Sequence, residues 1–534
     1  MRRVVLIAVL VALVASAAAT AAQARTEPAQ QPFRVLIVDH LRLADLQRLE
    51  KRGAVGLLVP GVGPTTNRRR ALASLLRGAV VNARLGGVPR GPQLIGTHAA
   101  TGIPTAHPVI VLALPKKGAL IRNDRRYPIA VLGRGCQGLL SSPTTRIPGL
   151  VSIVDIAPTA LGHLRGSLSC TPAANAGATV QRLNRQISAN NVLKLPSLFV
   201  VAGVAVLLAL FRPRAALATP SAALLATLLL GAIGATNAWA LAVSLGLLAF
   251  AGALLLGRLC RTEGRLLALF AGTIALYLAA LVFEPTWVAI NPLGPTQNSR
   301  FYGVGNQLET LLLVPALLGA ALAGKRFGLP GFVAFAGVSL LTVSANGLGS
   351  DAGGAIVLAV GFAVLGARLT RVRGRGIVVA LGLSAAAVAT LVSWDLHHGG
   401  QNHLRSAFDN GPKGMLAVIE NRVPLAYQPA VDQWYLTTEL AVAFVVVALL
   451  ALAQRRHPAG RRAVLEAVVV SVVTSLLVND SAAYVLLAGA TCLVAVARPA
   501  FAYAPLRRLS LVPTPLVPVP QRAAPEAPVL PDYN

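Results

Sequence analysis

The run that decides the fold begins where the polar N-terminal third of this 534-residue chain ends. Residues 195–211 read LPSLFVVAGVAVLLALF, without a charged side chain. A transmembrane helix needs roughly 20 mainly apolar residues, with about 17 as the lower limit, so this run predicts a membrane span. It is the first of the apolar runs, which are centred near residues 204, 225, 247, 275, 313, 335, 360, 386, 443, 470 and 490. The sequence therefore predicts an α-helical polytopic membrane domain of about 11 transmembrane helices over residues 195–498.

The composition of the whole chain agrees with burial in lipid. Apolar residues make up 55% of it and charged residues 13%, against about a quarter in soluble proteins. The net charge of +29 comes from 48 Lys and Arg against 19 Asp and Glu, but loops that border lipid collect arginine for topological reasons. No nucleic-acid partner is therefore expected. The presence of only 4 cysteines excludes a disulfide scaffold.

The two termini differ from the membrane domain. A basic start at Met1–Arg3, an apolar stretch over 4–15 and the small-x-small pattern at Ala22–Ala24 predict a secretory signal peptide over residues 1–24. An uncleaved anchor is the alternative, and both deliver the next segment to the extracytoplasmic side. Residues 499–534 are Pro-rich and unpatterned, which predicts a disordered tail.

Residues 25–190 form a separate, strongly basic piece with 22 Lys and Arg against 6 Asp and Glu. Short β-like runs at 34–38, 54–59, 108–113 and 127–132 alternate with helical stretches at 43–52, 68–77 and 156–165. This alternation predicts a small exported α/β domain with a largely parallel sheet. Cys136 and Cys170 are its two cysteines, and we expect them to form a disulfide because export permits one.

Basic residues in alternate loops predict the orientation of the spans. The basic turns lie at residues 212–214, 258–265, 325–326, 368–375 and 455–462. The positive-inside rule puts these turns in the cytoplasm, which leaves the N-terminal domain extracytoplasmic and the C-terminal tail cytoplasmic. The expected location is the cell membrane, as a multi-pass protein.

The same topology puts the polar segments of the membrane domain at its outer face. Tyr302, Asn306 and Glu309 lie at i, i+4 and i+7, so we expect one stripe on the fifth span, with Glu309 about 10–12 Å from the start of the helix. An ionised carboxylate at that depth is costly unless it is paired or hydrated. We interpret the stripe as the wall of a water-filled cavity that opens outward. A buried ion pair with Arg300 or Arg422 is the structural alternative.

Glycines surround Asp351 in the segment 346–354, which also contains Gly349. A glycine-rich turn that leads into a helix N-terminus presents N–H donors that suit a phosphate group. Helix capping by Asp351 is one structural alternative, and close helix packing by the glycines is another. Asn479 and Asp480 belong to a further outer segment, and capping is again the alternative for Asp480.

The outer loop around residues 394–405 carries ionisable groups. His398, His403 and Arg405 offer acid, base or phosphate-binding groups, although a hydrated surface loop is the alternative. Together with Glu309 they are the expected catalytic residues. The expected substrate-binding residues are Arg300, Tyr302, Asn306, Gly349, Asp351, Asn479 and Asp480. A divalent cation held by the acidic groups would reconcile them with a phosphate and is the cofactor that the sequence suggests.

The exported domain resembles a shortened member of the alkaline phosphatase superfamily. The run VLIVDHL is similar to that superfamily's first strand, which ends in a metal-binding Asp, here Asp39. The run GPTTN resembles the stretch that holds the nucleophile, which gives Thr65 or Thr66 that position, and VDIAPT at 154–159 resembles a late segment. The chain lacks an Asp-His-Gly motif, and the domain is less than half the usual size. The resemblance thus implies a degenerate, metal-free domain in which these three residues are vestigial.

The whole-chain arrangement resembles a family of uncharacterised bacterial polytopic membrane proteins. These pair such an exported domain with an SRFYG-x-GN motif, here at 299–306, and with glycine-rich and NDS segments, here at 347–354 and 479–481. The layout is also similar to that of the ethanolamine-phosphate transferases of lipid-anchor synthesis. This likeness is an analogy of architecture and does not fix function.

Together these features predict action at the extracytoplasmic face on a phosphate-bearing lipid or lipid-linked glycan in cell-envelope assembly. Transfer of a head group or glycan is the first reaction class, and membrane lipids are the expected partners. A transporter or flippase, with Glu309 and Glu439 as coupling groups, is one alternative. The other is a non-catalytic scaffold whose basic domain binds anionic envelope polymers. Few polar residues fall in the inner half of the spans, which favours the enzyme over the transporter.

Overall fold

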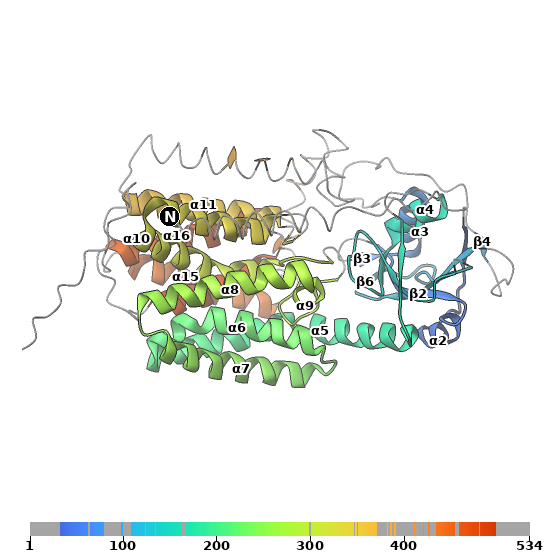
Figure 1. The fold of residues 1–534 in the computed structure, drawn as a ribbon, viewed down its shortest axis with the longest axis horizontal. Helices are drawn as coiled ribbons and strands as arrows, with labels where there is room; N and C mark the ends of the chain where they lie inside the picture. Colours follow the sequence, from blue (N-terminus) through green and yellow to red (C-terminus); the bar gives the residue numbers. More distant parts are fainter. Residues whose placement is uncertain are drawn as a thin grey trace, which may run out of the picture.

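The computed structural model contains a helical bundle and a smaller α/β domain at one end of it (Figure 1). It describes residues 33–61, 65–78, 98–99, 108–122, 124–133, 135–162, 167–297, 301–345, 348–349, 351–370, 434–453, 459–479 and 481–497, with isolated residues between 382 and 427. The expected signal peptide and tail, most of the span near 386 and the loop 394–405 lie outside these residues.

The α/β domain is built on a mixed sheet. Its strands are β1 (Arg34–Ile37), β2 (Gly53–Val59), β4 (His98–Ala99), β5 (Val109–Leu112), β7 (Tyr127–Leu132), β8 (Gly138–Ser141), β9 (Leu150–Ser152) and β10 (Ser169–Pro172). The order is β10-β8-β2-β7-β5-β1-β4, with β9 paired to β2, while β3 (Thr65–Thr66) and β6 (Ile121–Arg122) form a separate pair.

The prediction of a largely parallel sheet is wrong at β7, which lies antiparallel between β2 and β5. A parallel return needs a crossover, usually a helix. The connection from β5 to β7 contains only the short strand β6 among its described residues, so the chain returns antiparallel. β1, β2 and β5 keep a common direction, and their carboxyl ends therefore share one edge of the sheet.

Helices cover both faces of this sheet. The short ones are η1 (Leu43–Asp45), α2 (Leu46–Leu49), α3 (Arg68–Arg77), η3 (Ile153–Asp155) and α4 (Ile156–Ala160). Ile110 of β5 clusters with Leu75 of α3 and Ile156 of α4, whereas the next residue, Val111, clusters with Val180 of α5. Successive side chains of a strand point to opposite faces, so the domain has two cores on either side of one sheet.

Helix α5 (Ala176–Phe211) runs without a break from the α/β domain into the bundle (Figure 1). At its start, the Gly177 N–H donates to Glu50 Oε2 at 2.6 Å. Further along, the guanidinium of Arg126 donates to Asn184 Oδ1 at 2.7 Å and to Ser188 Oγ at 2.6 Å. Burial lowers the pKa of Arg126 to about 10. The α/β domain is thus fastened to a helix that continues into the bundle.

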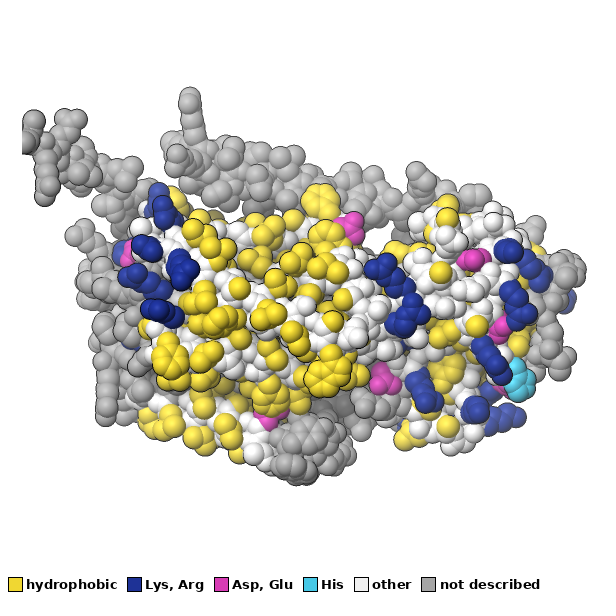
Figure 2. All heavy atoms as spheres, turned by 90° about the horizontal axis from the view of Figure 1, so that it is seen from below, with side chains coloured by type: hydrophobic (Ala, Val, Ile, Leu, Met, Phe, Trp, Pro, Cys, Tyr) yellow, Lys and Arg dark blue, Asp and Glu magenta, His cyan; other side chains and the backbone are white. Residues whose placement is uncertain are grey.

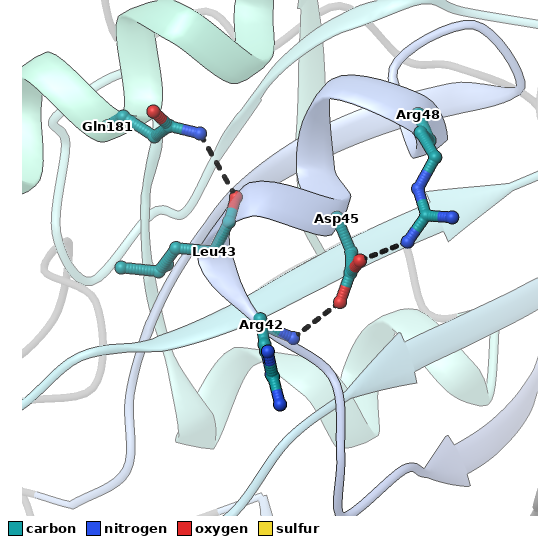
Figure 3. A network of polar contacts seen from close by, with 5 residues as sticks. All are labelled: Arg42, Leu43, Asp45, Arg48 and Gln181. Carbon is teal, nitrogen blue, oxygen red and sulfur yellow. Dashed lines mark hydrogen bonds and ion pairs between the residues drawn. The ribbon is translucent and has the colours of Figure 1, made fainter.

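The turn before α2 is also held against α5 (Figure 3). The side chain of Gln181 on α5 donates to the Leu43 carbonyl at 3.4 Å. The carboxylate of Asp45 accepts from the Arg42 N–H at 2.8 Å and pairs with Arg48. The Arg42 N–H and the Arg48 guanidinium lower the pKa of Asp45, and these contacts order the turn next to α5.

A disulfide joins Cys136 to Cys170, with the two Cα atoms 6.4 Å apart. This is the pair expected from the sequence. It connects the segment before β8 to β10, two neighbouring antiparallel strands. Since β10 leads directly into α5, the bond stabilises the edge of the sheet from which the long helix starts.

The bundle contains α5 and the helices that follow it. They are α6 (Pro213–Ile233), α7 (Ala238–Leu259), α8 (Glu263–Phe283), α9 (Pro285–Ala289), α10 (Asn306–Ser344), α11 (Ala352–Thr370), α15 (Trp434–Ala453), α16 (Ala459–Val478) and α17 (Ala482–Ala497). In the described part of the chain, six helices are long and apolar enough to cross a membrane. The expected count of about 11 is not confirmed. The runs expected near residues 313 and 335 are the two halves of α10, which are separated by a break where Gly328 has a φ of 72°. The halves pack side by side, since a Cβ on Gly319 would lie 2.2 Å from Phe335 Cζ.

The surface of the bundle is apolar as well as its interior (Figure 2). Leu247, Leu255 and Phe283 are 65%, 57% and 76% exposed. Apolar surface on this scale is unfavourable in water and suits contact with lipid. Lys and Arg side chains gather at both ends of the apolar zone, as they do at the borders of a bilayer. The bundle thus has the surface of a membrane-embedded protein.

Candidate functional site

Glu309 lies in the first turn of α10, which begins at Asn306. It is three residues, or about 4.5 Å, from the start of the helix, and the predicted depth of 10–12 Å is therefore wrong. Tyr302 precedes the helix altogether. The single stripe fails because Gly303 has a φ of 80°, a left-handed conformation that a helix does not contain.

The carboxylate of Glu309 is fully buried and contacts the end of α16. The side-chain amide of Asn479 donates to Glu309 Oε2 at 3.0 Å and to Ser475 Oγ at 2.6 Å. Glu309 is 0% exposed and Asn479 is 2% exposed, so this contact lies in the protein interior. Sequence analysis missed Ser475. The signal was its i, i+4 spacing to Asn479, which puts both side chains on one helix face.

The glycines at the start of α11 make room for these two side chains. A Cβ on Gly353 would lie 2.3 Å from Asn479 Oδ1, and one on Gly354 would lie 2.8 Å from Glu309 Cγ. Real Cβ contacts are not this short. The two glycines are therefore required for Glu309 and Asn479 to approach α11 as closely as they do.

Asp351 caps the same helix. Its Oδ1 accepts the Gly354 N–H at 3.1 Å, and its own carbonyl accepts the Ala355 N–H at 2.9 Å. Helix capping by Asp351, the structural alternative, is therefore confirmed. Asp351 is also 1% exposed, and its Oδ1 would be 3.5 Å from a Cβ on Gly353. The carboxylates of Asp351 and Glu309 thus border the same Gly353–Gly354 turn.

The segment before α10 and the glycine-rich segment before α11 are hydrogen-bonded to each other beside this turn. The Val304 N–H donates to the Gly349 carbonyl at 2.9 Å, and a Cβ on Gly303 would lie 2.1 Å from that oxygen. The Asp351 N–H in turn donates to the Val343 carbonyl at 3.0 Å. The SRFYG and glycine-rich segments therefore pack as one unit around the starts of α10 and α11.

Tyr302 contacts the α/β domain. The guanidinium of Arg146 lies over its ring, 4.1 Å from the centroid, which is a cation–π contact. Phe301 is 3% exposed and belongs to a core cluster of that domain. The residues expected on one stripe are thus divided, with Tyr302 at the domain junction and Glu309 within the bundle.

Lys194, which sequence analysis also missed, supports this junction from α5. Its side chain is 2% exposed and its Nζ donates to the carbonyls of Gly294 and Pro295, the latter at 3.0 Å. These carbonyls belong to the segment that leads to Phe301. The sequence feature that could have identified Lys194 is its position directly before the uncharged run 195–211.

Asp39, Thr65 and Thr66 lie at the carboxyl edge of the sheet. Asp39 follows β1 and is paired with Arg68 at 2.6 Å, while Thr65 and Thr66 form β3. Arg68 also donates to the Pro115 carbonyl at 3.4 Å. The Asp39 carboxylate thus neutralises an arginine in this structure.

Arg300, His398, His403, Arg405 and Asp480 lie outside the described residues, so their roles stay predictions. Within the described ranges no group of three or more His, Cys, Asp or Glu side chains could hold a metal ion. Glu309 and Asp351 offer two carboxylates. A divalent cation prefers six or more oxygen ligands, so these residues supply only part of such a set.

Comparison with known proteins finds no relative: no protein-family model, no curated protein and no solved structure matches this chain. The resemblances drawn from its motifs therefore stay predictions. The function has to be argued from the residues around Glu309.

Proposed function

We propose that the protein acts at the extracytoplasmic face of the membrane on a phosphate-bearing lipid or lipid-linked glycan, and transfers a head group or glycan. The observation that carries this proposal is the convergence of Glu309, Asp351 and Asn479 where α10, α11 and α16 meet. The three residues come from segments far apart in the chain.

Burial of two carboxylates in a bundle of this kind is expensive. An ionised carboxylate loses its hydration there and needs partners that replace it. Apolar side chains of similar size would pack the same space at lower cost. Glycines at 353 and 354 that make room for Asn479 and Glu309 therefore favour a functional role for the cluster.

The chemistry of the cluster fits group transfer. An acceptor hydroxyl has to lose a proton when it attacks, and Glu309 is a carboxylate that can accept one. The Asn479 amide, which donates to Glu309 Oε2, holds the carboxylate in place. A divalent cation at Glu309 and Asp351 would supply neutralising charge for a substrate phosphate.

A transporter or flippase for the same lipid is the second candidate, and Glu439 of α15 favours it. This side chain is 7% exposed, and neither of its carboxylate oxygens has a hydrogen-bond partner among the described residues. Intramembrane carboxylates without fixed partners mark ion or proton pathways. Transport would use Glu439 as the coupling group.

The test is depletion of the protein followed by mass spectrometry of the lipids that accumulate. An enzyme leaves its lipid substrate on the extracytoplasmic leaflet, whereas loss of a flippase leaves it on the cytoplasmic leaflet. A membrane-impermeant reagent distinguishes the two. Glu309→Gln should fail to complement the depletion, and Glu284→Gln, at an exposed acid at the end of α8, should complement. An unchanged lipid profile would overturn both candidates.

A further inference from the structure

The turn between β5 and β6 contains an apolar side chain that is exposed to solvent. Leu120 is 65% exposed and is the one large hydrophobic residue of the α/β domain that is exposed in the described part of residues 33–175. Two residues earlier, Gly118 has a φ of 77°, and a Cβ built on it would have no atom within 4 Å. The turn therefore projects into open space.

The edge of the sheet that bears this turn faces the bundle. Glu50, before the start of β2, contacts α5 at Gly177, whereas Arg126, beside the carboxyl ends of β2 and β5, contacts it at Asn184 and Ser188. Since α5 runs from residue 177 toward the bundle, the carboxyl edge is the nearer one. Figure 1 agrees, because β3 and β6 lie on the side of the sheet next to the bundle.

The distance to the membrane is short. From Ser188 to residue 195, where the uncharged run of α5 begins, the helix rises by about 10 Å. The turn between β5 and β6 spans residues 113–120, and four extended residues reach about 13 Å. The tip of the turn can therefore reach the level at which the apolar run starts.

The charges of the turn match an anionic surface. Lys116 and Lys117 are exposed, and neither belongs to an ion pair among the described residues. Basic side chains near a bilayer bind the phosphate groups of anionic lipids. An exposed leucine beside two such lysines combines apolar burial with attraction to anionic lipids, the two interactions that hold a segment at the interface.

We propose that residues 116–120 form a membrane-contact loop. Leu120 enters the interfacial region of the bilayer, and Lys116 and Lys117 bind the phosphates of anionic lipid head groups. The proposal does not depend on the reaction or on the residues around Glu309. It gives the α/β domain a direct contact with lipid, in addition to its connections to the bundle through α5 and through Phe301 and Tyr302.

The test uses the full chain in nanodiscs with a polarity-sensitive dye on Leu120→Cys; the native free cysteines, Cys260 and Cys492, are buried. In phosphatidylcholine discs that contain about a third phosphatidylglycerol, we expect a blue-shifted dye that spin-labelled lipids quench. Lys51→Cys, exposed at the opposite edge of the sheet, is the matched control and should remain in water. Lys116→Gln with Lys117→Gln should lower the docked fraction, with a shift in equilibrium of about 30-fold.

Three results would overturn the proposal. The first is a dye at position 120 that is as hydrated as the dye at position 51 in anionic discs. The second is docking that is the same in discs of phosphatidylcholine alone, or that the lysine substitutions do not change, since either removes the role of anionic lipid. The third is inhibition of docking by millimolar inorganic phosphate, which would identify a site for the free anion. The disulfide between Cys136 and Cys170 serves as the folding control for each variant.

Discussion

The substitution Gly354→Ala tests whether the glycines of α11 make room for Glu309. A Cβ at this position would lie 2.8 Å from Glu309 Cγ and 2.7 Å from Val343 Cγ1, so at least one of these atoms has to move. Overpacking of this kind costs about 1–3 kcal/mol, while the helix propensity of Ala offsets about 0.5–1 kcal/mol. We expect a net loss of about 1 kcal/mol in stability and a displaced Glu309 carboxylate.

Gly366→Ala in the same helix is the matched control. Its Cβ would lie 3.5 Å from Phe332 Cε1, an ordinary contact, so the helix propensity of Ala should leave stability unchanged or slightly raised. The assays are thermal unfolding in detergent and complementation of a depleted strain. Gly354→Ala should lower the unfolding midpoint and abolish complementation. If the Gly354→Ala protein is as stable and as active as the Gly366→Ala protein, the position of Glu309 does not depend on close packing against Gly354.

Three further predictions concern the rest of the chain. A reporter fused after Asn237 should be active only outside the cytoplasm and one fused after Arg261 only inside it; the reverse pattern would contradict the orientation inferred from basic loops. Cys136→Ser should lower the stability of the oxidised protein by about 3–4 kcal/mol, the chain-entropy value for a separation of 34 residues, and an equal midpoint for both proteins would refute it. Burial raises the pKa of Asp155 from 3.8 to about 6, so folding favours its protonated form. The stabilisation from this group is complete below pH 3.8 and lost as pH rises through about 6, and Asp155→Asn should flatten the pH dependence of unfolding in this window.

Local periodicity predicts the longer elements of the α/β domain but not their pairing. The sequence predicts a strand at 127–132 and a helix at 68–77, and β7 and α3 have these bounds. The direction of β7 depends on how the chain returns after β5, and alternation of apolar residues contains no information on direction. The mixed sheet was therefore missed although β1, β2, β5 and β7 were predicted, and the short strands β4, β8, β9 and β10 were not predicted at all.

For the membrane helices, hydropathy predicts the apolar runs but not the way in which they are joined. Apolar runs near residues 313 and 335 predict two spans, and the kink at Gly328 separates the halves of α10 that contain them. Hydropathy does not report whether consecutive runs are joined by a loop or by a bend within one helix. Here the break at Gly328 joins two halves that pack side by side, so the two predicted runs remain two separate helices.

Three residues of the candidate site were predicted from the sequence, whereas their arrangement was not. Glu309, Asp351 and Asn479 were expected at one face of the bundle, because loop charges and polar segments are local properties. The contact between Glu309 and Asn479 joins residues 170 positions apart, which follows only from the packing of α10 against α16. The stripe was wrong because the i, i+4, i+7 rule holds only within a helix, and Gly303 delays the start of α10 by its left-handed φ.

The segment 301–304 accounts for this division of one motif between two parts of the molecule. Phe301 and Tyr302 pack on the α/β domain, while Val304, two residues later, donates to Gly349 beside the start of α11. A side chain on Gly303 would overlap the Gly349 carbonyl, so the chain can cross from one part to the other in this short distance only with glycine there. The position of the α/β domain and the start of the helix that bears Glu309 are therefore set by the same four residues. Displacement of the domain would strain the backbone of the site, and an intact junction is a condition for the Glu309 carboxylate to meet Asn479.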